Sequence, residues 1–392
     1  MKPIETERLL LRPFRLRDAA AVSRNSTRPN VARFMPDMIL KTPRDARRWI
    51  RWANRQRRNA DTTSRVILAV VRKSGNQCIG MVGVGLKPEL DNEVEIGYLV
   101  ADEYQNQGYI TEAGRAMSDW AFAHMPLPYL VAIVRHDNPA SSRVIEKLGF
   151  ACAGEREIGG DTMNYYRLER PGAFQKAKDW FSGGAALEEM QAHSRLKLWE
   201  SEAAAEFPAG AKLLDIGCGT GREAFALHAM GFRVTGADIS ERVIKAARGM
   251  AATQGIGVDF LVADGESLPF EDNTFDVIVI WAQTFGLFHG EEKQRDILAR
   301  CGRVLKPGGL LSFSAHDREY QQAHCAQYLK GRRFCPFAET DLYYESFTPD
   351  ELRRAAERAG FRVLACKRGL VYSEADGTIL HCLCENCLCK KE

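Results

Sequence analysis

Two strand–glycine–helix turns, far apart in the chain, limit how it can fold. One occupies residues 104–113 and the other residues 213–221, and each lies between an apolar run and a helical pattern. Alternation of strands and helices predicts an α/β architecture. Because 392 residues exceed what one typical hydrophobic core holds, the sequence predicts two α/β domains.

The first pattern covers residues 1–170. Helical spacing predicts helices from Thr111 to about His124 and from Asn138 to Leu148, and Gly149 ends the second one. Apolar runs predict strands over 65–72, 78–86, 94–101 and 129–135, and in the closing segments FACAGERE and MNYYRLER. We therefore expect one domain over 1–170.

A Pro- and Gly-containing segment without periodicity, 171–185, is predicted to be a linker. A helix is expected over about 186–206. From Lys212 strands alternate with helices, which predicts a parallel, doubly wound sheet over 186–392. Its expected strands are KLLDIG, RVTGAD, VDFLVAD, FDVIVIWA, GLLSFSAH, FRVLACKR and TILHCLC.

Composition excludes little. Hydrophobic content is 45%, charged content 27% and net charge +3, values that do not indicate a nucleic-acid partner. No apolar run reaches the roughly 18 residues of a membrane span. The opening MKPIETERLLLRPF lacks the apolar stretch of a signal peptide. We expect a cytoplasmic protein without a membrane partner, and the sequence predicts no oligomeric state.

The first turn has the chemistry of an anion site. Unpaired backbone N–H groups at a helix start bind phosphate, and Gly108 permits close approach of a ligand. Three segments then resemble the GNAT acetyltransferase superfamily, in particular its branch that acetylates ribosomal-protein N-termini: the phosphate loop Gln105–Ala113, the opening Ile4–Phe14 and the late helix Asn138–Phe150. Ile110 replaces a small residue of the loop pattern.

This resemblance implies a mixed sheet with helices on both faces, and acetyl-CoA as cofactor. A backbone N–H near Tyr98–Val100 would polarise the thioester carbonyl, and Asn138 would bind pantetheine or position the site. The residues implied in cofactor binding are Tyr98, Val100, Gln105, Gln107, Gly108, Tyr109, Ile110 and Asn138.

Glu95 is the candidate that removes the amine proton, although it could equally pair with an arginine on the sheet face. Many GNAT proteins carry a tyrosine acid seven residues after the asparagine, where this chain has Ile145. Either Ser141 or Ser142 assists, or the thiolate takes its proton from water or the amine. Glu93 and Glu112 are expected to be a solvated charge and a helix-start charge.

The second turn, LLDIGCGTG, has three glycines, and Asp238 and Asp264 end the next two strands. These stretches, with ADGESLPFEDNTFDVIV and LARCGRVLKPGGLLSFS, resemble the class I methyltransferases. The resemblance implies a Rossmann-like, seven-stranded sheet and S-adenosyl-L-methionine as cofactor. It carries Asp215, Gly217, Gly219 and Gly221 over as contacts of the methionine and ribose, Asp238 as a ribose contact and Asp264 as an adenine contact, with a turn or helix-cap role as the alternative for Asp264.

Methyl transfer from a sulfonium is an in-line displacement, so no obligatory base is expected. Trp281–Phe285 is expected to face the substrate. Residues 316–346 are interpreted as a substrate lid or as an ordinary surface helix. The terminal Cys382, Cys384, Cys387 and Cys389 are consistent with burial in a strand, with metal binding or with thiol chemistry.

The leading hypothesis is a bifunctional transferase, with an N-acetyltransferase followed by a methyltransferase. The expected acceptors are an amine, on a small molecule or a protein N-terminus, and a small molecule for methylation. One alternative keeps the methyltransferase active and makes the first domain a cofactor-binding or regulatory module. A second alternative is a thiol-rich metal-binding or sensing protein.

Overall fold

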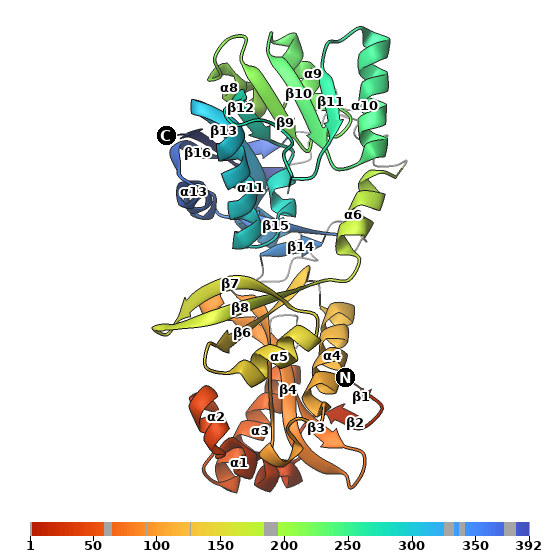
Figure 1. Cartoon of the computed structure of the whole chain (residues 1–392), viewed down its shortest axis with the longest axis vertical. Helices are drawn as coiled ribbons and strands as arrows, with labels where there is room; N and C mark the ends of the chain where they lie inside the picture. Colours follow the sequence, from red (N-terminus) through yellow and green to blue (C-terminus); the bar gives the residue numbers. More distant parts are fainter. Residues whose placement is uncertain are drawn as a thin grey trace. The chain divides into compact units, whose positions relative to one another are not determined.

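The computed structural model describes residues 2–58, 65–90, 92–125, 127–183, 195–265, 267–324, 333–336, 342–371 and 382–391. These residues form two compact units, one ending at Pro171 and the other beginning at Gly172. Each unit has its own sheet (Figure 1). None of the described helices has the length and apolar character that crossing a membrane requires.

The first unit contains an eight-stranded sheet with the strand order β1-β2-β3-β4-β5-β6-β8-β7. Among the described strands of this sheet, β5 and β6 alone pair in parallel. The strands are β1 (Ile4–Glu5), β2 (Leu9–Arg12), β3 (Val66–Arg72), β4 (Gln77–Lys87), β5 (Glu93–Val100), β6 (Tyr129–Arg135), β7 (Ala151–Ile158) and β8 (Asp161–Glu169). The helices are α1 (Ala19–Ser26), α2 (Pro29–Phe34), α3 (Pro43–Arg58), α4 (Tyr109–His124) and α5 (Pro139–Lys147), with short 3-10 turns at Leu16–Asp18, Pro36–Met38, Pro88–Leu90 and Asp102–Tyr104.

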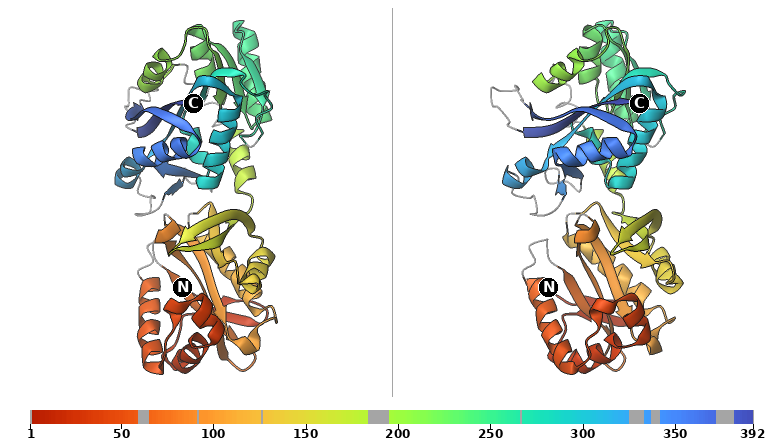
Figure 2. Two further views of the ribbon diagram at one scale, coloured as in Figure 1. Left: turned by 60° about the vertical axis from the view of Figure 1, so that its left-hand side comes forward. Right: turned by 90° about the vertical axis from the view of Figure 1, so that its left-hand side faces the viewer.

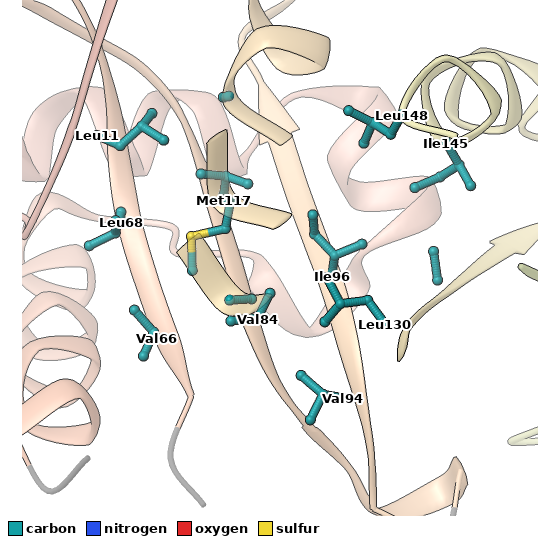
Figure 3. Packing of buried hydrophobic residues seen from close by; sticks show 14 of the residues in the cluster. Leu11, Val66, Leu68, Val84, Val94, Ile96, Met117, Leu130, Ile145 and Leu148 are labelled. Carbon is teal, nitrogen blue, oxygen red and sulfur yellow. The ribbon is translucent and has the colours of Figure 1, made fainter. Parts of the chain in front are cut away.

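Alternation along the strands buries both faces of this sheet. In β3, Val66, Leu68 and Val70 join the cluster under α4 and α5, where Met117 and Ile145 are also buried (Figure 3). The intervening residues of β3 join a second cluster with α1 and α3. The predicted mixed sheet with helices on both faces is therefore confirmed.

The three helices before β3 are absent from the sequence prediction. In α3, Ala46, Ile50 and Ala53 repeat at helical spacing and are nearly inaccessible. Arginines fill most of the remaining positions of this helix. A narrow apolar stripe in such a charged segment is easily overlooked, because the helix gains its stability from packing against the sheet.

The second unit is doubly wound, as predicted (Figure 2). Its strands are β9 (Lys212–Ile216), β10 (Arg233–Asp238), β11 (Asp259–Val262), β12 (Phe275–Ile280), β13 (Leu305–Asp317), β14 (Phe334–Pro336), β15 (Tyr343–Phe347), β16 (Phe361–Val371) and β17 (Cys382–Lys391). Its helices are α6 (Ala173–Phe181), α8 (Leu198–Ala205), α9 (Arg222–Ala229), α10 (Glu241–Gln254), α11 (Glu291–Val304), α12 (Arg318–His324) and α13 (Pro349–Arg358), with a 3-10 turn at Thr284–Leu287.

The core of this sheet runs in the order β11-β10-β9-β12-β13, all parallel. It has nine strands rather than the predicted seven, because β15 and β14 as well as β17 and β16 join it beyond β13. The all-parallel prediction is wrong for β17, which pairs antiparallel with both β13 and β16. The stretch between β16 and β17 is shorter than the dozen or so residues that a parallel crossover needs. Helices α8, α9 and α10 cover one face, and α11 and α13 cover the other.

Three predicted segments differ in detail. The predicted linker contains a helix, α6, which begins after Gly172 in a left-handed conformation. The expected helix over 186–206 is seen as α8 only from Leu198, and its first part lies outside the described residues. The last strand extends beyond the predicted segment because it is paired on both sides.

The segment predicted as a lid contains α12 and the short ribbon β14–β15, which joins β13 where His316 pairs with Ser346. The remainder of that segment lies outside the described residues. Neither interpretation of this segment, as a lid or as a surface helix, predicted the strands. The extra ribbon enlarges the sheet at the carboxyl end of β13.

Candidate functional site

The first candidate site lies where β5 and β6 diverge. These parallel strands share a single register pair, Glu95 with Val131, whereas β5 pairs with β4 along its whole length. Beyond Glu95, the residues of β5 have no register partner on the β6 side within the described part of the chain. The two strands therefore open a wedge toward their carboxyl ends, next to the predicted cofactor contacts Tyr98 and Val100.

The loop after β5 presents a helix start to this wedge. Gly108 caps α4 in the left-handed region, at φ 77°. The backbone hydrogen bonds of the described residues include none donated by the N–H groups of Tyr109, Ile110 and Thr111, as expected at a helix start. The side chains of Gln105 and Gln107 bond within the loop, to Asp102 and Glu103. Their predicted role would thus rest on backbone groups.

Arg8 is a neighbour of this loop that the sequence reasoning missed. Its Nη1 donates to the Gln107 carbonyl at 3.0 Å, its Nε bonds Glu112 at 2.7 Å, and its guanidinium lies 4.5 Å from the Tyr109 ring centroid. Glu112 also accepts hydrogen bonds from Thr6 and the Arg8 amide, so it fastens the helix start to the strand region. A cation beside a helix start favours binding of phosphate.

Glu95 has an environment suited to proton transfer. Its side chain is 25% exposed, and its carboxylate lies 3.9 Å from the Lys87 ammonium. Burial raises the pKa of Glu95, and Lys87 opposes this effect only in part. Among the described residues the ion pair of Glu95 is with Lys87 rather than with an arginine, although the charge of Arg65 also acts to lower the pKa of this carboxyl. A carboxylate with a raised pKa accepts protons more readily near neutral pH.

Across the wedge, the β5 side chain of Tyr98 reaches the start of α5. Its hydroxyl lies 2.8 Å from Ser141 Oγ and donates to the Ser141 carbonyl at 3.2 Å. Burial raises the pKa of Tyr98 to about 12, so the phenol stays protonated. Asn138 caps α5, its oxygen accepting from the Ser141 N–H at 3.2 Å. Ile145 is buried in the core, away from polar chemistry.

The prediction that Glu93 is a solvated charge is wrong. Its carboxylate accepts hydrogen bonds from the Tyr129 hydroxyl at 2.6 Å and the Tyr165 hydroxyl at 2.9 Å. Strand pairing brings these phenols to Glu93 from β6 and β8, a long-range arrangement that no local pattern reveals. Arg167 stacks on the Tyr129 ring at 3.6 Å. A polar cluster thus lies at the amino ends of β5 and β6, against β8.

The second candidate site lies at the carboxyl edge of the other sheet, between β9 and β12. Strand order reverses at this point, and ligands of open α/β sheets bind at such a reversal. Gly217, Gly219 and Gly221 all have positive φ, and a Cβ at Gly217 would meet the Thr284 side chain at 2.5 Å. Glycine is therefore required here to let the two edge loops approach each other.

A buried acidic cluster lies behind this turn. Arg222 binds both carboxylate oxygens of Glu200, at 2.7 and 2.9 Å, and also contacts Glu223. Asp215 is 1% exposed, and its Oδ2 has no hydrogen-bond partner among the described residues. Burial raises the pKa of Asp215 well above its usual range, and Glu223 adds to this. With Arg222 and Lys197 as the neighbouring cations, three carboxylates face two positive charges, an arrangement that suits a cationic ligand.

The two other predicted acids lie on neighbouring strand ends. Asp238 accepts from the Gly219 N–H at 3.1 Å and the Ser240 N–H at 2.9 Å, and burial raises the pKa of this carboxyl. These contacts bring the carboxylate to the glycine turn. Asp264 accepts from the Ser267 hydroxyl at 2.6 Å, which corresponds to the turn role named as its alternative.

The segment after β12 is strained. Ala282 and Gln283 both adopt positive φ, which costs non-glycine residues free energy and is common at functional sites. Gln283 is 8% exposed, its N–H donates to Ser314 Oγ at 3.3 Å, and its side-chain Nε2 has no partner among the described residues. Such a buried donor is suited to hydrogen-bond a ligand.

His316, on the same face of β13 as Ser314, continues this polar stripe. Its Nδ1 lies 3.2 Å from Gln321 Nε2, and its ring meets Tyr344 edge-on at 5.0 Å. Burial lowers the pKa of His316 to about 4, and Lys197 adds to this, so the imidazole is neutral at physiological pH. No local pattern singles out this histidine, because its neighbours come from other elements.

The terminal cysteines are only partly described. Cys387 and Cys389 are buried in β17 against the α13 side of the sheet, and their sulfur atoms lie 3.4 Å apart. This agrees with the burial interpretation for these two. The side chains of Cys382 and Cys384 lie outside the described residues. Within the described part of the chain, no group of three or more His, Cys, Asp or Glu side chains has the arrangement of a metal site.

Each half of the chain matches a known protein family. Residues 8–151 match the acetyltransferase (GNAT) domain family, and residues 213–309 match a methyltransferase domain family. A ubiquinone biosynthesis O-methyltransferase from Coxiella burnetii is 30% identical over 194 residues, which are 48% of this chain and 79% of that protein. A protein of the same name from Sinorhizobium fredii is 31% identical over 159 residues, which are 39% of this chain and 61% of that protein.

Solved structures resemble each half as well. A SAM-dependent methyltransferase from Methanosarcina mazei has a TM-score of 0.43 at 22% identity, covering 50% of this chain and 98% of that one. A GNAT-family acetyltransferase from Bacillus anthracis has a TM-score of 0.36 at 26% identity, covering 43% of this chain and 99% of that one. The two family matches and the O-methyltransferase relative show that this chain has an N-terminal GNAT acetyltransferase domain and a C-terminal methyltransferase domain.

Proposed function

We propose that this protein is a bifunctional transferase. Its first domain transfers an acetyl group from acetyl-CoA to a primary amine, and its second transfers a methyl group from S-adenosyl-L-methionine to a small molecule. The observation that carries the proposal is the presence, in each sheet, of a glycine turn at a strand end with groups that suit the cofactor. Among the described residues, these groups are the N–H donors of residues 109–111, which have no backbone acceptor, and the buried Oδ2 of Asp215, which has no hydrogen-bond partner.

In the acetyltransferase, the backbone groups of residues 108–111 and Arg8 would hold the pyrophosphate. The wedge between β5 and β6 would admit the pantetheine, and a backbone N–H near Tyr98 would polarise the thioester carbonyl. Glu95 would take the proton of the attacking amine, directly or through water. Asn138 already caps α5, so its contribution would be to position this wall of the site.

The proton for the departing thiolate has two local sources. Ser141 and Tyr98 share a hydrogen bond of 2.8 Å, so a proton given by Ser141 is replaceable from the phenol. This pair would act where other GNAT proteins use the tyrosine that Ile145 replaces. The alternative, a first domain that only binds cofactor or regulates, is favoured by that same replacement. Loss of acetyl transfer in the Ser141→Ala variant, with acetyl-CoA affinity intact, would favour the active enzyme.

In the methyltransferase, Asp215 would attract the ammonium group of the cofactor's methionine part, Asp238 would bind the ribose hydroxyls and Asp264 the adenine. The cofactor supplies a methyl group already activated for displacement by its sulfonium. Gln283 and His316 lie at the edge where the acceptor would enter, one as a donor and the other as a neutral imidazole. The O-methyltransferase relatives make a hydroxyl group the first acceptor to test.

The acceptor classes follow from these sites. For acetylation, the acceptor is a small amine or a protein N-terminus, the latter in keeping with the ribosomal-protein branch that the motifs resemble. For methylation, it is a small molecule rather than a nucleic acid or a lipid surface. Free cysteines such as Cys78, Cys218 and Cys301, together with both cofactors, support a cytoplasmic location.

The test uses the full-length chain with two labelled donors. Labelled acetyl-CoA is incubated with N-terminal peptides and simple primary amines, and labelled S-adenosyl-L-methionine with simple phenols and catechols, and product formation is followed. Acetyl transfer lost in Glu95→Gln and methyl transfer lost in Asp238→Asn would support the proposal. Methyl transfer alone, with no acetyl transfer to any amine, would support the runner-up with a regulatory first domain.

A further inference from the structure

Gly97 lies at the point where the two strands of the acetyltransferase wedge separate. It is the next residue after Glu95 on the same face of β5, because side chains alternate along a strand. Glu95 is the last residue of β5 that is in register with β6. Gly97 is exposed, although Ile96 and Leu99 beside it are buried. The face of the sheet is thus open at this one residue of the strand.

Nothing in the fold explains why residue 97 is a glycine. No heavy atom of the described residues lies within 4 Å of the position that a Cβ would take. Its φ is also outside the left-handed region that favours glycine. By contrast, a Cβ at Gly80, Gly83 or Gly85 in the neighbouring strand would meet another atom at 2.3–2.7 Å. Those glycines are needed for packing, and Gly97 is not.

A glycine without a packing role has a cost. In the middle of a strand it is less favourable than alanine, because it loses more backbone freedom on folding. A strand glycine often marks a place where a ligand approaches the backbone closely. The groups around Gly97 identify that ligand. Glu95 precedes it on the same face, and the N–H groups near Tyr98 that would polarise a carbonyl follow it. The carbon under attack must lie between the two.

We propose that the acyl group rests directly against Gly97, and that residue 97 limits the size of the acyl group the domain accepts. This inference rests on the proposed acetyltransferase function and adds a residue that selects the acyl donor. The Cβ position of residue 97 is open space, with no heavy atom of the described residues within 4 Å, so a methyl carbon of the acyl group can occupy it. A methyl group on residue 97 would take the place of the methyl group of acetyl.

The test measures binding of CoA, acetyl-CoA and propionyl-CoA by calorimetry, so no acceptor is needed. The Gly97→Ala variant should keep or slightly raise its unfolding temperature, because the new methyl group contacts nothing and alanine is more favourable than glycine within a strand. We expect its Kd for CoA to stay within about twofold. Overpacking should raise the Kd for acetyl-CoA by roughly five- to a hundredfold, and that for propionyl-CoA further. Gly97→Val should enlarge both effects.

Gly249→Ala is the matched control. Gly249 lies in α10 of the other unit, it too has no heavy atom within 4 Å of its Cβ position, and its φ is ordinary. This variant should bind all three ligands as the parent does. Equal weakening of CoA and acetyl-CoA by Gly97→Ala, or no weakening of either, would overturn the acyl subsite while leaving the proposed function. Failure of the parent chain to bind any of the three would overturn both.

Discussion

Replacing Asp215 with asparagine should raise the stability of the methyltransferase domain and lower its affinity for the cofactor. The side chain is 1% exposed, its Oδ2 has no partner among the described residues, and Glu200 and Glu223 lie close by. Asparagine has the same shape without the charge. Relief of an uncompensated buried carboxylate is worth about 1–3 kcal/mol.

The affinity of Asp215→Asn for the cofactor should fall. A charge-assisted hydrogen bond to the cofactor's ammonium contributes about 1.5–3 kcal/mol, which corresponds to a roughly 10- to 150-fold rise in the Kd for S-adenosylhomocysteine. Calorimetric titration measures this Kd. Scanning calorimetry measures the stability, with the transition of the second unit identified by its shift on ligand addition.

The pH dependence provides a second check. Because the folded-state pKa of Asp215 is raised, its contribution to stability is present at acid pH and is lost as pH rises through that pKa. The stability gain of Asp215→Asn should therefore vanish in acid and grow toward neutral pH. Ligand affinity of the parent should fall as pH decreases through the same range, because the neutral carboxyl no longer attracts a cation.

Asp276→Asn is the control for this substitution. Asp276 accepts from Lys306 at 2.7 Å and from the Lys212 N–H at 2.8 Å, and these contacts outweigh burial and lower the pKa of the carboxyl. Its loss should reduce stability and leave the Kd unchanged. The reasoning would be refuted if Asp215→Asn lowered stability and bound S-adenosylhomocysteine as tightly as the parent.

Three further predictions concern the two sites. Gly108→Ala should raise the Kd for acetyl-CoA at least tenfold and lower the free energy of unfolding by about 1–2 kcal/mol, because φ is 77° there. Gly149→Ala, also at positive φ, should lower stability without changing the Kd. Equal Kd values for the two variants would contradict this prediction. Glu95→Gln should lower the kcat of acetyl transfer by roughly 10²–10⁴-fold without changing acetyl-CoA affinity. The rate of the parent enzyme should rise with pH through the raised pKa of Glu95. A parent rate that does not depend on pH would argue against Glu95 as the base. Gln283→Ala should lower methyl transfer while S-adenosylhomocysteine affinity stays within about threefold, and unchanged steady-state turnover would remove Gln283 from the acceptor site.

The strands and the glycine turns were predictable because their signals are local. The apolar runs of β3 and β4 and the glycines of 217–221 specify their conformation within a few residues. The antiparallel β17 was not predictable in this way, since a strand's direction depends on which neighbour it joins. Helix α3 was missed because its stabilising partner, the sheet, is distant in sequence.

The candidate sites show the same division. Asp215, Asp238 and Gly108 lie where motif and chain direction placed them. Arg8 beside the phosphate loop, the two phenols on Glu93 and the contact between Tyr98 and Ser141 each join residues from separate elements. Such contacts depend on strand order and register, which emerge only in the assembled sheet. The roles of these residues therefore become visible only in the structure.

The central claim is that one chain carries two independent cofactor sites. The most direct measurement is a titration of the full-length protein with acetyl-CoA and with S-adenosylhomocysteine, repeated for Gly108→Val and Gly219→Val. The account predicts one saturable site for each ligand in the parent, loss of only the first in Gly108→Val, and loss of only the second in Gly219→Val. Absence of saturable binding, or an unchanged affinity for both ligands in both variants, would contradict it.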